Sequence, residues 1–294
     1  MNQLQTLSDA LCDLLNQIEG TDLRLIVGGG FGIYLKTEHV TKLGARTLIE
    51  PEFWPEARST NDLDLFLRPE LLSDSAKLKP LSQAIYDLDY RPVPGAEKYQ
   101  FIKSADQGSG TATLKIDILT GPRDAFASTK LRVDDRRVRP SPSVDLHAHP
   151  VDEAPTLERN LLPVEVSGTL SSGQAWKGKV FLPHPFTFIM MKLFAFRDRL
   201  LNEPGQERAQ YHALDIYCIL ATTTEDEWKQ AITLRDEFQQ HPFLIEAGRI
   251  AQKYFDRLEQ MGLIRLQESR YYRDDFKLRP FSSALLELFP VSAR

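Results

Sequence analysis

The chain has 294 residues, of which 42% are apolar, and is therefore long enough to bury one large core or two ordinary ones. Its formal net charge of -5 excludes an overall electrostatic attraction to nucleic acid or to an anionic membrane, while leaving room for a local basic patch. No run approaches the roughly 18 apolar residues that span a bilayer, and the N-terminus shows no signal-peptide pattern, so we expect a cytoplasmic protein that binds no membrane.

Leucine and isoleucine recur at helical spacing over residues 3–19, which predicts an amphipathic helix that Gly20 ends. Cys12 lies in this stretch, and Cys218 lies in another apolar helical stretch far along the chain. This placement favours buried free thiols over a disulfide framework and indicates a reducing compartment.

A short apolar strand over residues 23–27 runs into Gly28, Gly29 and Gly30, and a helical pattern follows to about residue 43. Strand, glycine turn and helix is an arrangement that holds phosphates. Glycines let backbone N–H groups approach an anion closely, and a helix N-terminus adds partial positive charge. The alternative is a tight packing turn, since the pattern matches neither a Walker loop nor a Rossmann fingerprint.

A loop over residues 44–60 leads through Arg58 and Thr60 into a strand that begins near Asp62. Because side chains alternate along a strand, Asp62 and Asp64 should share one face. Two neighbouring carboxylates repel each other, and Mg²⁺ would neutralise them, since it binds one or two protein carboxylates together with water and phosphate. The alternative is an exposed Asp-x-Asp at a strand edge.

A helix is predicted at about residues 71–88, followed by strands at 99–103 and 111–119 that are separated by a turn at 106–110. The second of these strands carries Asp117 in an otherwise apolar run. A buried acid is costly unless it is paired, liganded or protonated, so Asp117 is a second candidate site residue. The alternative is an aspartate that caps a turn at the strand end.

Residues 121–139 concentrate six arginines and lysines. They would either steer a triphosphate or an RNA backbone, or form a solvated face balanced by Asp134 and Asp135. His147 and His149 have the spacing of a metal pair, but no cysteine or third histidine lies near them, which favours a loop without metal. Strands at 161–166 and 178–182 complete this half.

From residue 183 the pattern is helical, with helices at about 207–221, 225–240, 243–262 and 280–289. Two domains are therefore expected, at residues 1–182 and 183–294. Lys192 and Asp215 lie in apolar helical stretches of the second domain. They would be a snorkelling lysine and its partner, or charges directed at a cleft, which the order of the motifs favours.

The glycine turn, the Asp-x-Asp strand and the later single aspartate resemble the nucleotidyltransferase superfamily, whose fold is related to polymerase beta. The closer resemblance is to the AbiEii-like toxins of type IV toxin–antitoxin systems, which show Arg-x-Ser/Thr-x-Asp-x-Asp. Here that pattern is Arg58, Thr60, Asp62 and Asp64, and Lys192 with Asp215 matches a Lys and an Asp in their helical half. The resemblance covers residues 23 to about 220.

The resemblance implies an α+β fold, in which an α/β nucleotidyltransferase core with a mixed sheet precedes an all-helical C-terminal domain. It implies transfer of an NMP from an NTP with Mg²⁺, or Mn²⁺ in its place, to an acceptor such as a tRNA 3′ end, and a cognate antitoxin as partner. The runner-up is a small-molecule enzyme of aminoglycoside type, and a third reading is a nucleotide-binding module without turnover. The resemblance implies metal binding and catalysis by Asp62, Asp64 and Asp117, and catalysis by Lys192 and Asp215. It implies contacts to the nucleotide by Gly28, Gly29, Gly30, Arg58 and Thr60.

Overall fold

The computed structural model describes residues 3–58, 60–106, 111–140, 144–202 and 205–291. Contacts divide the chain into two compact units. The first comprises the described residues within 1–35, 59–152 and 161–183, and the second comprises those within 36–58, 153–160 and 184–294. Two segments that the sequence analysis assigns to residues 1–182, namely 36–58 and 153–160, therefore group with the C-terminal helices.

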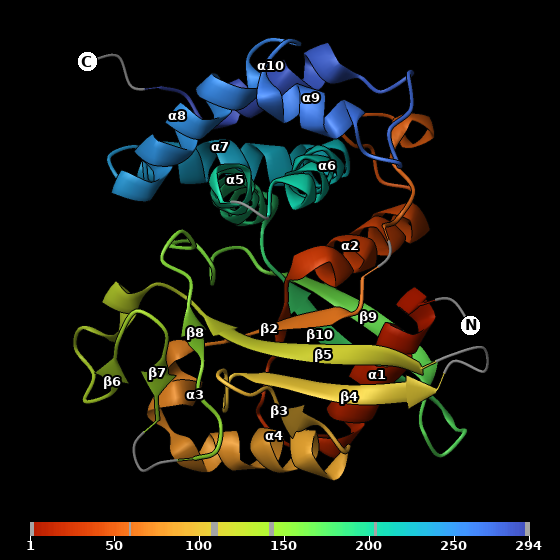
Figure 1. Cartoon of the computed structure of the whole chain (residues 1–294), viewed down its shortest axis with the longest axis vertical. Helices are drawn as coiled ribbons and strands as arrows, with labels where there is room; N and C mark the ends of the chain where they lie inside the picture. Colours follow the sequence, from red (N-terminus) through yellow and green to blue (C-terminus); the bar gives the residue numbers. More distant parts are fainter. Residues whose placement is uncertain (1–2, 59, 107–110, 141–143, 203–204, 292–294) are drawn as a thin grey trace. The chain divides into compact units, whose positions relative to one another are not determined.

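The first unit is built on an eight-stranded mixed sheet (Figure 1). Seven of its strands follow the order β3-β4-β5-β2-β1-β10-β9, and the eighth, β8, pairs with β5. Three pairs are parallel, namely β2 with β5, β1 with β10 and β5 with β8, and the others are antiparallel. The strands are β1 (Ile26–Val27), β2 (Asp62–Leu67), β3 (Arg91–Pro92), β4 (Gln100–Asp106), β5 (Thr111–Thr120), β8 (His149–Pro150), β9 (Leu162–Thr169) and β10 (Ala175–Leu182). A separate ribbon pairs β6 (Arg132–Val133) with β7 (Val138–Arg139). The strands predicted at 99–103 and 111–119 are β4 and β5, and part of the turn predicted between them, residues 107–110, lies outside the described residues.

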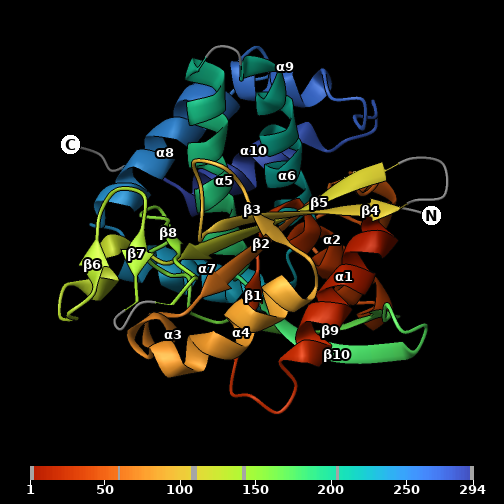
Figure 2. The same ribbon diagram turned by 60° about the horizontal axis from the view of Figure 1, so that its bottom comes forward.

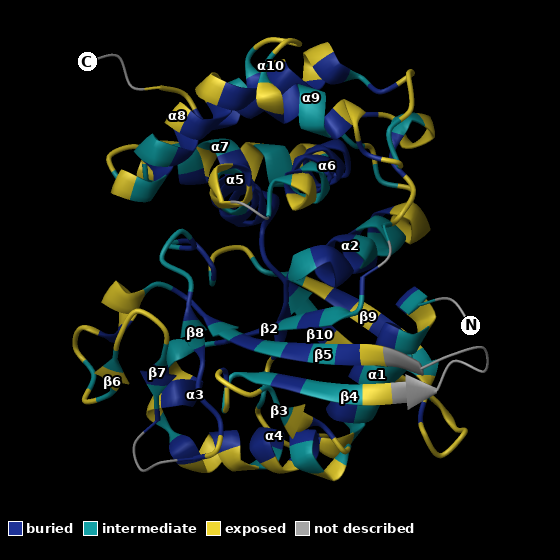
Figure 3. Cartoon of the chain, viewed as in Figure 1, coloured by how far each residue is buried: buried dark blue, intermediate teal, exposed yellow. Residues whose placement is uncertain are grey.

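One face of this sheet carries the core of the first unit. Helices α1 (Gln3–Gln17) and α4 (Ser75–Asp87) lie on this face in both views (Figure 1, Figure 2). Leu63 and Leu65 of β2 are fully buried in this core, whereas Asp62 and Asp64, which alternate with them along the strand, are only half-buried. The strand period of two thus separates an apolar face from a carboxylate face, and Figure 3 shows the alternation along β2 and β5.

The helix predicted at about 71–88 is two helices in the structure, α3 (Pro69–Ser73) and α4. Asp74 lies between them, and its side chain accepts a hydrogen bond from the backbone N–H of Ala76 at 3.1 Å. This N-cap starts a new helix inside a stretch whose apolar period is continuous.

The second unit is helical. Its α-helices from residue 184 onward are α5 (Pro185–Leu201), α6 (Ala209–Ala221), α7 (Glu225–Glu237), α8 (Pro242–Phe255), α9 (Met261–Gln267) and α10 (Leu278–Leu288). Helices α5 and α6 are buried along most of their length and pack against each other, while α8, α9 and α10 cover them. The helix predicted at 243–262 is α8, which ends at Phe255, and the separate helix α9 begins only at Met261. A mixed sheet core followed by helices confirms the predicted α+β fold class.

Both cysteines are buried free thiols, as the sequence predicts. Burial raises the pKa of Cys12 and of Cys218 to about 12, so neither supplies a thiolate nucleophile at neutral pH. Among the helices that the structure describes, none is both long enough and apolar enough to cross a bilayer.

Candidate active site

The glycine segment forms the first turn of α2 (Gly29–Leu43), which begins directly after β1. The sequence pattern predicts a glycine turn ahead of a helix, but the structure places Gly29 and Gly30 inside the helix itself. The first intrahelical bond runs from the N–H of Gly32 to the carbonyl oxygen of Gly28 at 2.8 Å. The N–H groups before it point out of the helix end, where the partial positive charge favours an anion.

This first turn lies tightly against β2. The backbone N–H of Gly28 donates to the carbonyl oxygen of Asp64 at 2.8 Å. Gly29 has a φ of +62°, and a Cβ there would lie 1.7 Å from Oδ2 of Asp64. Glycine is required at position 29 for both reasons, and the Asp64 carboxylate therefore lies beside the start of the helix.

The predicted carboxylates come from two neighbouring parallel strands. In the register of β2 and β5, Asp62 lies opposite Lys115 and Asp64 lies opposite Asp117. Residues paired in this way point to the same face, so Asp62, Asp64 and Asp117 share the face opposite the apolar core. The structure thus places the three carboxylates on one face of the sheet.

Asp117 has an unusual environment. Its Oδ2 accepts a hydrogen bond from Nζ of Lys115 at 2.8 Å, while its Oδ1 is buried and makes no hydrogen bond within the part of the chain that the structure describes. Burial raises the pKa of Asp117, the Lys115 ammonium lowers it, and the charge of Asp62 raises it further. A hydrogen bond from the Gln100 side chain also lowers this pKa, and the net shift is upward. A buried carboxylate oxygen that has no hydrogen-bond partner among the described residues, here called an orphaned oxygen, marks a place for a cation or a proton donor.

Lys115 is a residue that the sequence analysis missed. The run around Asp117 was interpreted as apolar apart from its carboxylate, although Lys115 lies two positions earlier and therefore on the same strand face. The strand period alone was sufficient to predict this pair.

The carboxylate face suits a hard cation that takes few protein ligands. Within the described ranges, no three side chains of His, Cys, Asp or Glu converge closely enough to hold a metal ion. Mg²⁺ usually binds through one or two carboxylates and completes its shell with water and substrate phosphates. Asp62 and Asp64 can provide these carboxylates. The orphaned Oδ1 of Asp117 fits the same need for a cation.

Arg58, Lys192 and Asp215 meet inside the second unit. Arg58 donates from Nε to Oδ1 of Asp215 at 2.7 Å and from a terminal nitrogen to Oδ2 at 3.0 Å, and Lys192 donates from Nζ to Oδ2 at 2.7 Å. Asp215 is 2% exposed. Burial alone would raise its pKa, but the two cations hold that pKa below its usual range. The ion pair of Lys192 with Asp215, which the sequence offers as the alternative to charges directed at a cleft, is therefore present, with Arg58 as an additional partner.

His212 is a second residue that the sequence analysis missed. It lies three residues before Asp215 on α6, a spacing that places both side chains on one side of a helix. Burial, together with the nearby Lys192 charge, lowers its pKa to about 3, so the ring is neutral at physiological pH. Its Nδ1 is buried and makes no hydrogen bond among the described residues.

Thr60 is buried in the first unit, where its hydroxyl accepts a long hydrogen bond of 3.5 Å from the N–H of Asp62. This contact supports the start of β2. The motif Arg-x-Thr-x-Asp-x-Asp therefore has its arginine in the second unit and its remaining members in the first.

Two of the six basic residues in the arginine-rich segment form ion pairs with acids of the described part of the chain. Arg123 pairs with Asp152 and with Asp135, and Arg139 pairs with Asp134. These pairs balance part of the charge of the segment and do not decide between a solvated face and an RNA-steering patch. His149 lies in β8, where its Nδ1 is 2.9 Å from the carbonyl oxygen of Arg136.

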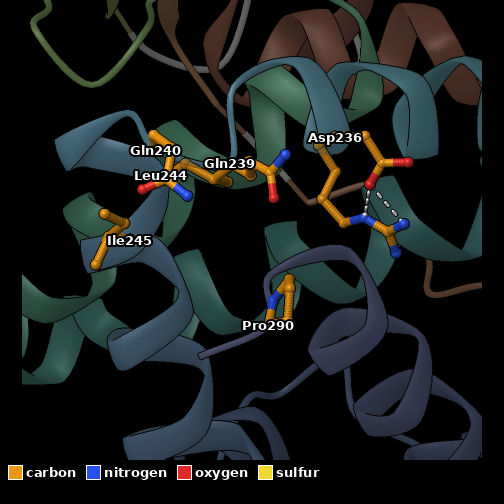
Figure 4. A pocket seen from close by; sticks show the side chains of 7 residues that line it. Asp236, Gln239, Gln240, Leu244, Ile245 and Pro290 are labelled. Carbon is orange, nitrogen blue, oxygen red and sulfur yellow. Dashed lines mark hydrogen bonds and ion pairs between the residues drawn. The ribbon is translucent and has the colours of Figure 1, made fainter. Parts of the chain in front are cut away.

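A pocket of about 400 Å³ lies in the second unit, where the segment after α7 meets α8 and Pro290 (Figure 4). Gln239 and Gln240 line it, and Arg235 at its edge pairs with Asp236 at 2.7 Å. None of the predicted site residues contributes to its lining. The candidate site is therefore the carboxylate face of the sheet and not this pocket.

No protein-family model matches this sequence. No curated protein matches it either. Among solved structures, the chain is similar to an antigenic nucleotidyltransferase-like protein from Paracoccidioides brasiliensis, with 14% identity, a TM-score of 0.38, and coverage of 83% of this chain and 91% of that chain. It is also similar to the antibiotic-resistance factor ANT(2'')-Ia, with 13% identity, a TM-score of 0.33, and coverage of 80% of this chain and 98% of that chain. Likenesses at these TM-scores carry no argument for a family or an activity.

Proposed function

We propose that this chain is a metal-dependent nucleotidyltransferase that moves an NMP from an NTP to an acceptor hydroxyl. One observation carries the proposal. Strands β2 and β5 run parallel and in register, so that Asp62, Asp64 and Asp117 share a face, and the first turn of α2 lies against Asp64. Carboxylates for a cation and helix amides for phosphates are the two requirements of phosphoryl transfer.

In this reaction the acceptor oxygen forms a bond to the α-phosphorus, the bond from that phosphorus to the bridging oxygen breaks, and pyrophosphate leaves. Asp62 and Asp64 would hold Mg²⁺ or Mn²⁺, which would supply stabilisation of the negative charge on the transferred phosphoryl group. Asp117 would accept the proton of the acceptor hydroxyl, a role that its raised pKa and its orphaned oxygen support. Gly29 and Gly30 would present backbone donors to the phosphates. The resemblance assigns the same role to Gly28, but the N–H of Gly28 is already donated to the carbonyl oxygen of Asp64.

The roles of Arg58, Lys192 and Asp215 at the nucleotide stay a prediction. The resemblance assigns the two cations to the charge of the leaving pyrophosphate and Asp215 to their orientation. Within the second unit, Asp215 bonds both cations, which by itself accounts for the burial of Lys192.

The acceptor implied by the resemblance is an RNA such as a tRNA 3′ end, and the toxin role and the antitoxin partner rest on the same resemblance. The acid-paired arginines of residues 123–139 do not favour RNA over a cationic small molecule such as an aminoglycoside. The acceptor assay therefore includes both classes. A nucleotide-binding module without turnover would bind NTP but release no pyrophosphate.

The test is incubation of the full chain with each labelled NTP, Mg²⁺, and either total tRNA or an aminoglycoside panel. Label should move to one acceptor with release of pyrophosphate, and Asp62→Asn and Asp64→Asn should each abolish the transfer. Asp87→Asn is the matched control, because this carboxylate in α4 is exposed and accepts a local hydrogen bond from Gln83. Transfer that persists in both site variants would refute the proposal.

A further inference from the structure

Lys115 lies among the three carboxylates of the candidate site. Its Cα is the register partner of Asp62, and its Nζ lies 2.8 Å from Oδ2 of Asp117. The Asp117 side chain is 16% exposed and the Lys115 side chain is 28% exposed. The contact is therefore partly shielded from water, and it is stronger than a surface ion pair.

This contact places an ammonium group on the carboxylate that a divalent cation would bind. Lys115 holds one oxygen of Asp117, and the other oxygen is buried without a hydrogen-bond partner among the described residues. In the same part of the chain, three acidic or metal-binding side chains do not converge on one point. A fixed ammonium and a divalent cation repel each other and compete for the same carboxylate charge.

We propose that Lys115 is the resident counter-ion of this carboxylate group, and that it must release Asp117 before a divalent cation can bind to Asp117 together with Asp62 and Asp64. The inference rests on the proposed function, because it concerns the same site. It makes Lys115 a positioning residue that keeps the free site short of one ligand. Binding of the metal to all three carboxylates then requires that Lys115 leave Asp117 and that the carboxylates converge. A negatively charged substrate that attracts Lys115 would assist that release.

The opposing view is that Lys115 and Asp117 form a structural ion pair with no bearing on metal binding. The two views differ in the effect of removing the ammonium. A structural pair leaves metal affinity unchanged or weakens it through local disorder, whereas a competing counter-ion makes metal affinity rise when it is removed.

The experiment is a titration of the full chain with Mn²⁺ in the absence of nucleotide, with free Mn²⁺ followed by electron paramagnetic resonance. The variants are Lys115→Met, which removes the ammonium and keeps a long side chain, and Lys115→Arg, which keeps the charge. Lys115→Gln replaces the methionine variant if that variant does not fold. Lys103→Met is the matched control, because Lys103 lies on the adjacent strand β4 opposite Leu114 and therefore points to the other face of the sheet.

We expect Lys115→Met to bind Mn²⁺ about tenfold more tightly than the wild type or better, because a charge-assisted hydrogen bond no longer has to be broken. Lys115→Arg and Lys103→Met should keep the wild-type affinity. An unchanged affinity in Lys115→Met, or an equal gain in Lys103→Met, would overturn the inference while leaving the proposed function intact, provided that Asp62→Asn abolishes binding. If neither the wild type nor Lys115→Met binds Mn²⁺, the metal site fails, and the proposed function fails with it.

Discussion

Replacing Gly29 with alanine tests how tightly the first turn of α2 lies against Asp64. Two penalties apply at this position. The backbone has a φ of +62°, and the new Cβ would lie 1.7 Å from Oδ2 and 2.7 Å from Cγ of Asp64. Gly20 separates the two penalties, because it has a φ of +80° in the same unit and a Cβ there would meet nothing within 4 Å.

The left-handed backbone alone should cost alanine about 1–2 kcal/mol at either position. Overpacking adds about 1–3 kcal/mol at Gly29, since the Asp64 side chain must leave its rotamer or the turn must shift. We therefore expect Gly20→Ala to lower the free energy of unfolding by about 1–2 kcal/mol, and Gly29→Ala to lower it by about 2–5 kcal/mol.

Urea denaturation, followed by circular dichroism, measures both variants and a double-mutant cycle with Asp64→Ala. Without the carboxylate, the nearest side-chain atom of residue 64 to the new Cβ is its own Cβ at 3.2 Å. The cost of Gly29→Ala should then approach that of Gly20→Ala. Equal costs in the wild-type background, or no coupling to Asp64, would refute the proposed contact between the helix turn and the carboxylate.

Three further predictions concern buried ionisable groups. Lys36 bonds both carboxylate oxygens of Glu227, at 2.6 and 2.7 Å, so Lys36→Met should cost about 3–5 kcal/mol in urea denaturation, whereas Lys229→Met, at an exposed pair, should cost less than about 1 kcal/mol. Asp215→Ala should cost about 3–5 kcal/mol, because it leaves two cations without their carboxylate. Burial raises the pKa of Asp215, but the two cations lower it by more, so the folded pKa lies below the unfolded value of about 3.9. The contribution of Asp215 to the free energy of unfolding is therefore present above the unfolded pKa and is lost as pH falls through the folded pKa. Burial lowers the pKa of His212 to about 3, below an unfolded value of about 6.5, so the unfolded state binds the proton first and stability rises with pH across this window. His212→Gln should flatten that rise in urea midpoints measured from pH 4 to 7.

The carboxylate strand was predictable because its signal is local. Alternation of Asp62 and Asp64 with Leu63 and Leu65 requires only the period of a strand, and the structure shows the alternation as a buried and a half-buried face. The same rule could have found Lys115 beside Asp117. That residue was missed because the run was interpreted by its apolar content and not by its faces.

The start of α2 was harder to predict. Glycine has a low helix propensity, so Gly29 and Gly30 indicate a turn ahead of a helix. In the structure these glycines are in the first helical turn, because a close approach to Asp64 excludes any Cβ at position 29. A tertiary contact of this kind overrides propensity and leaves no local signal.

The pairing of distant strands and the grouping of distant segments could not be predicted from the sequence. The parallel register that places Asp117 opposite Asp64 joins strands more than forty residues apart, and it depends on the path of the chain between them. In the same way, residues 36–58 follow the first part of α2 in sequence but group with the C-terminal helices. One consequence is that Arg58 bonds Asp215, a partner that no spacing within its own motif indicates.

The contact between Gly29 and Asp64 also couples the two ends of the candidate site. The amides of the first turn of α2 favour an anion, and in the free protein the Asp64 carboxylate already lies beside them. A phosphate approaching the same amides meets the negative charge of Asp64 at short range, and this repulsion opposes binding. If Asp62 and Asp64 held a divalent cation, it would neutralise the carboxylates and replace that repulsion with attraction. Nucleotide binding by this chain should therefore require the metal, and the carboxylates govern the phosphate end of the site as well as the metal end.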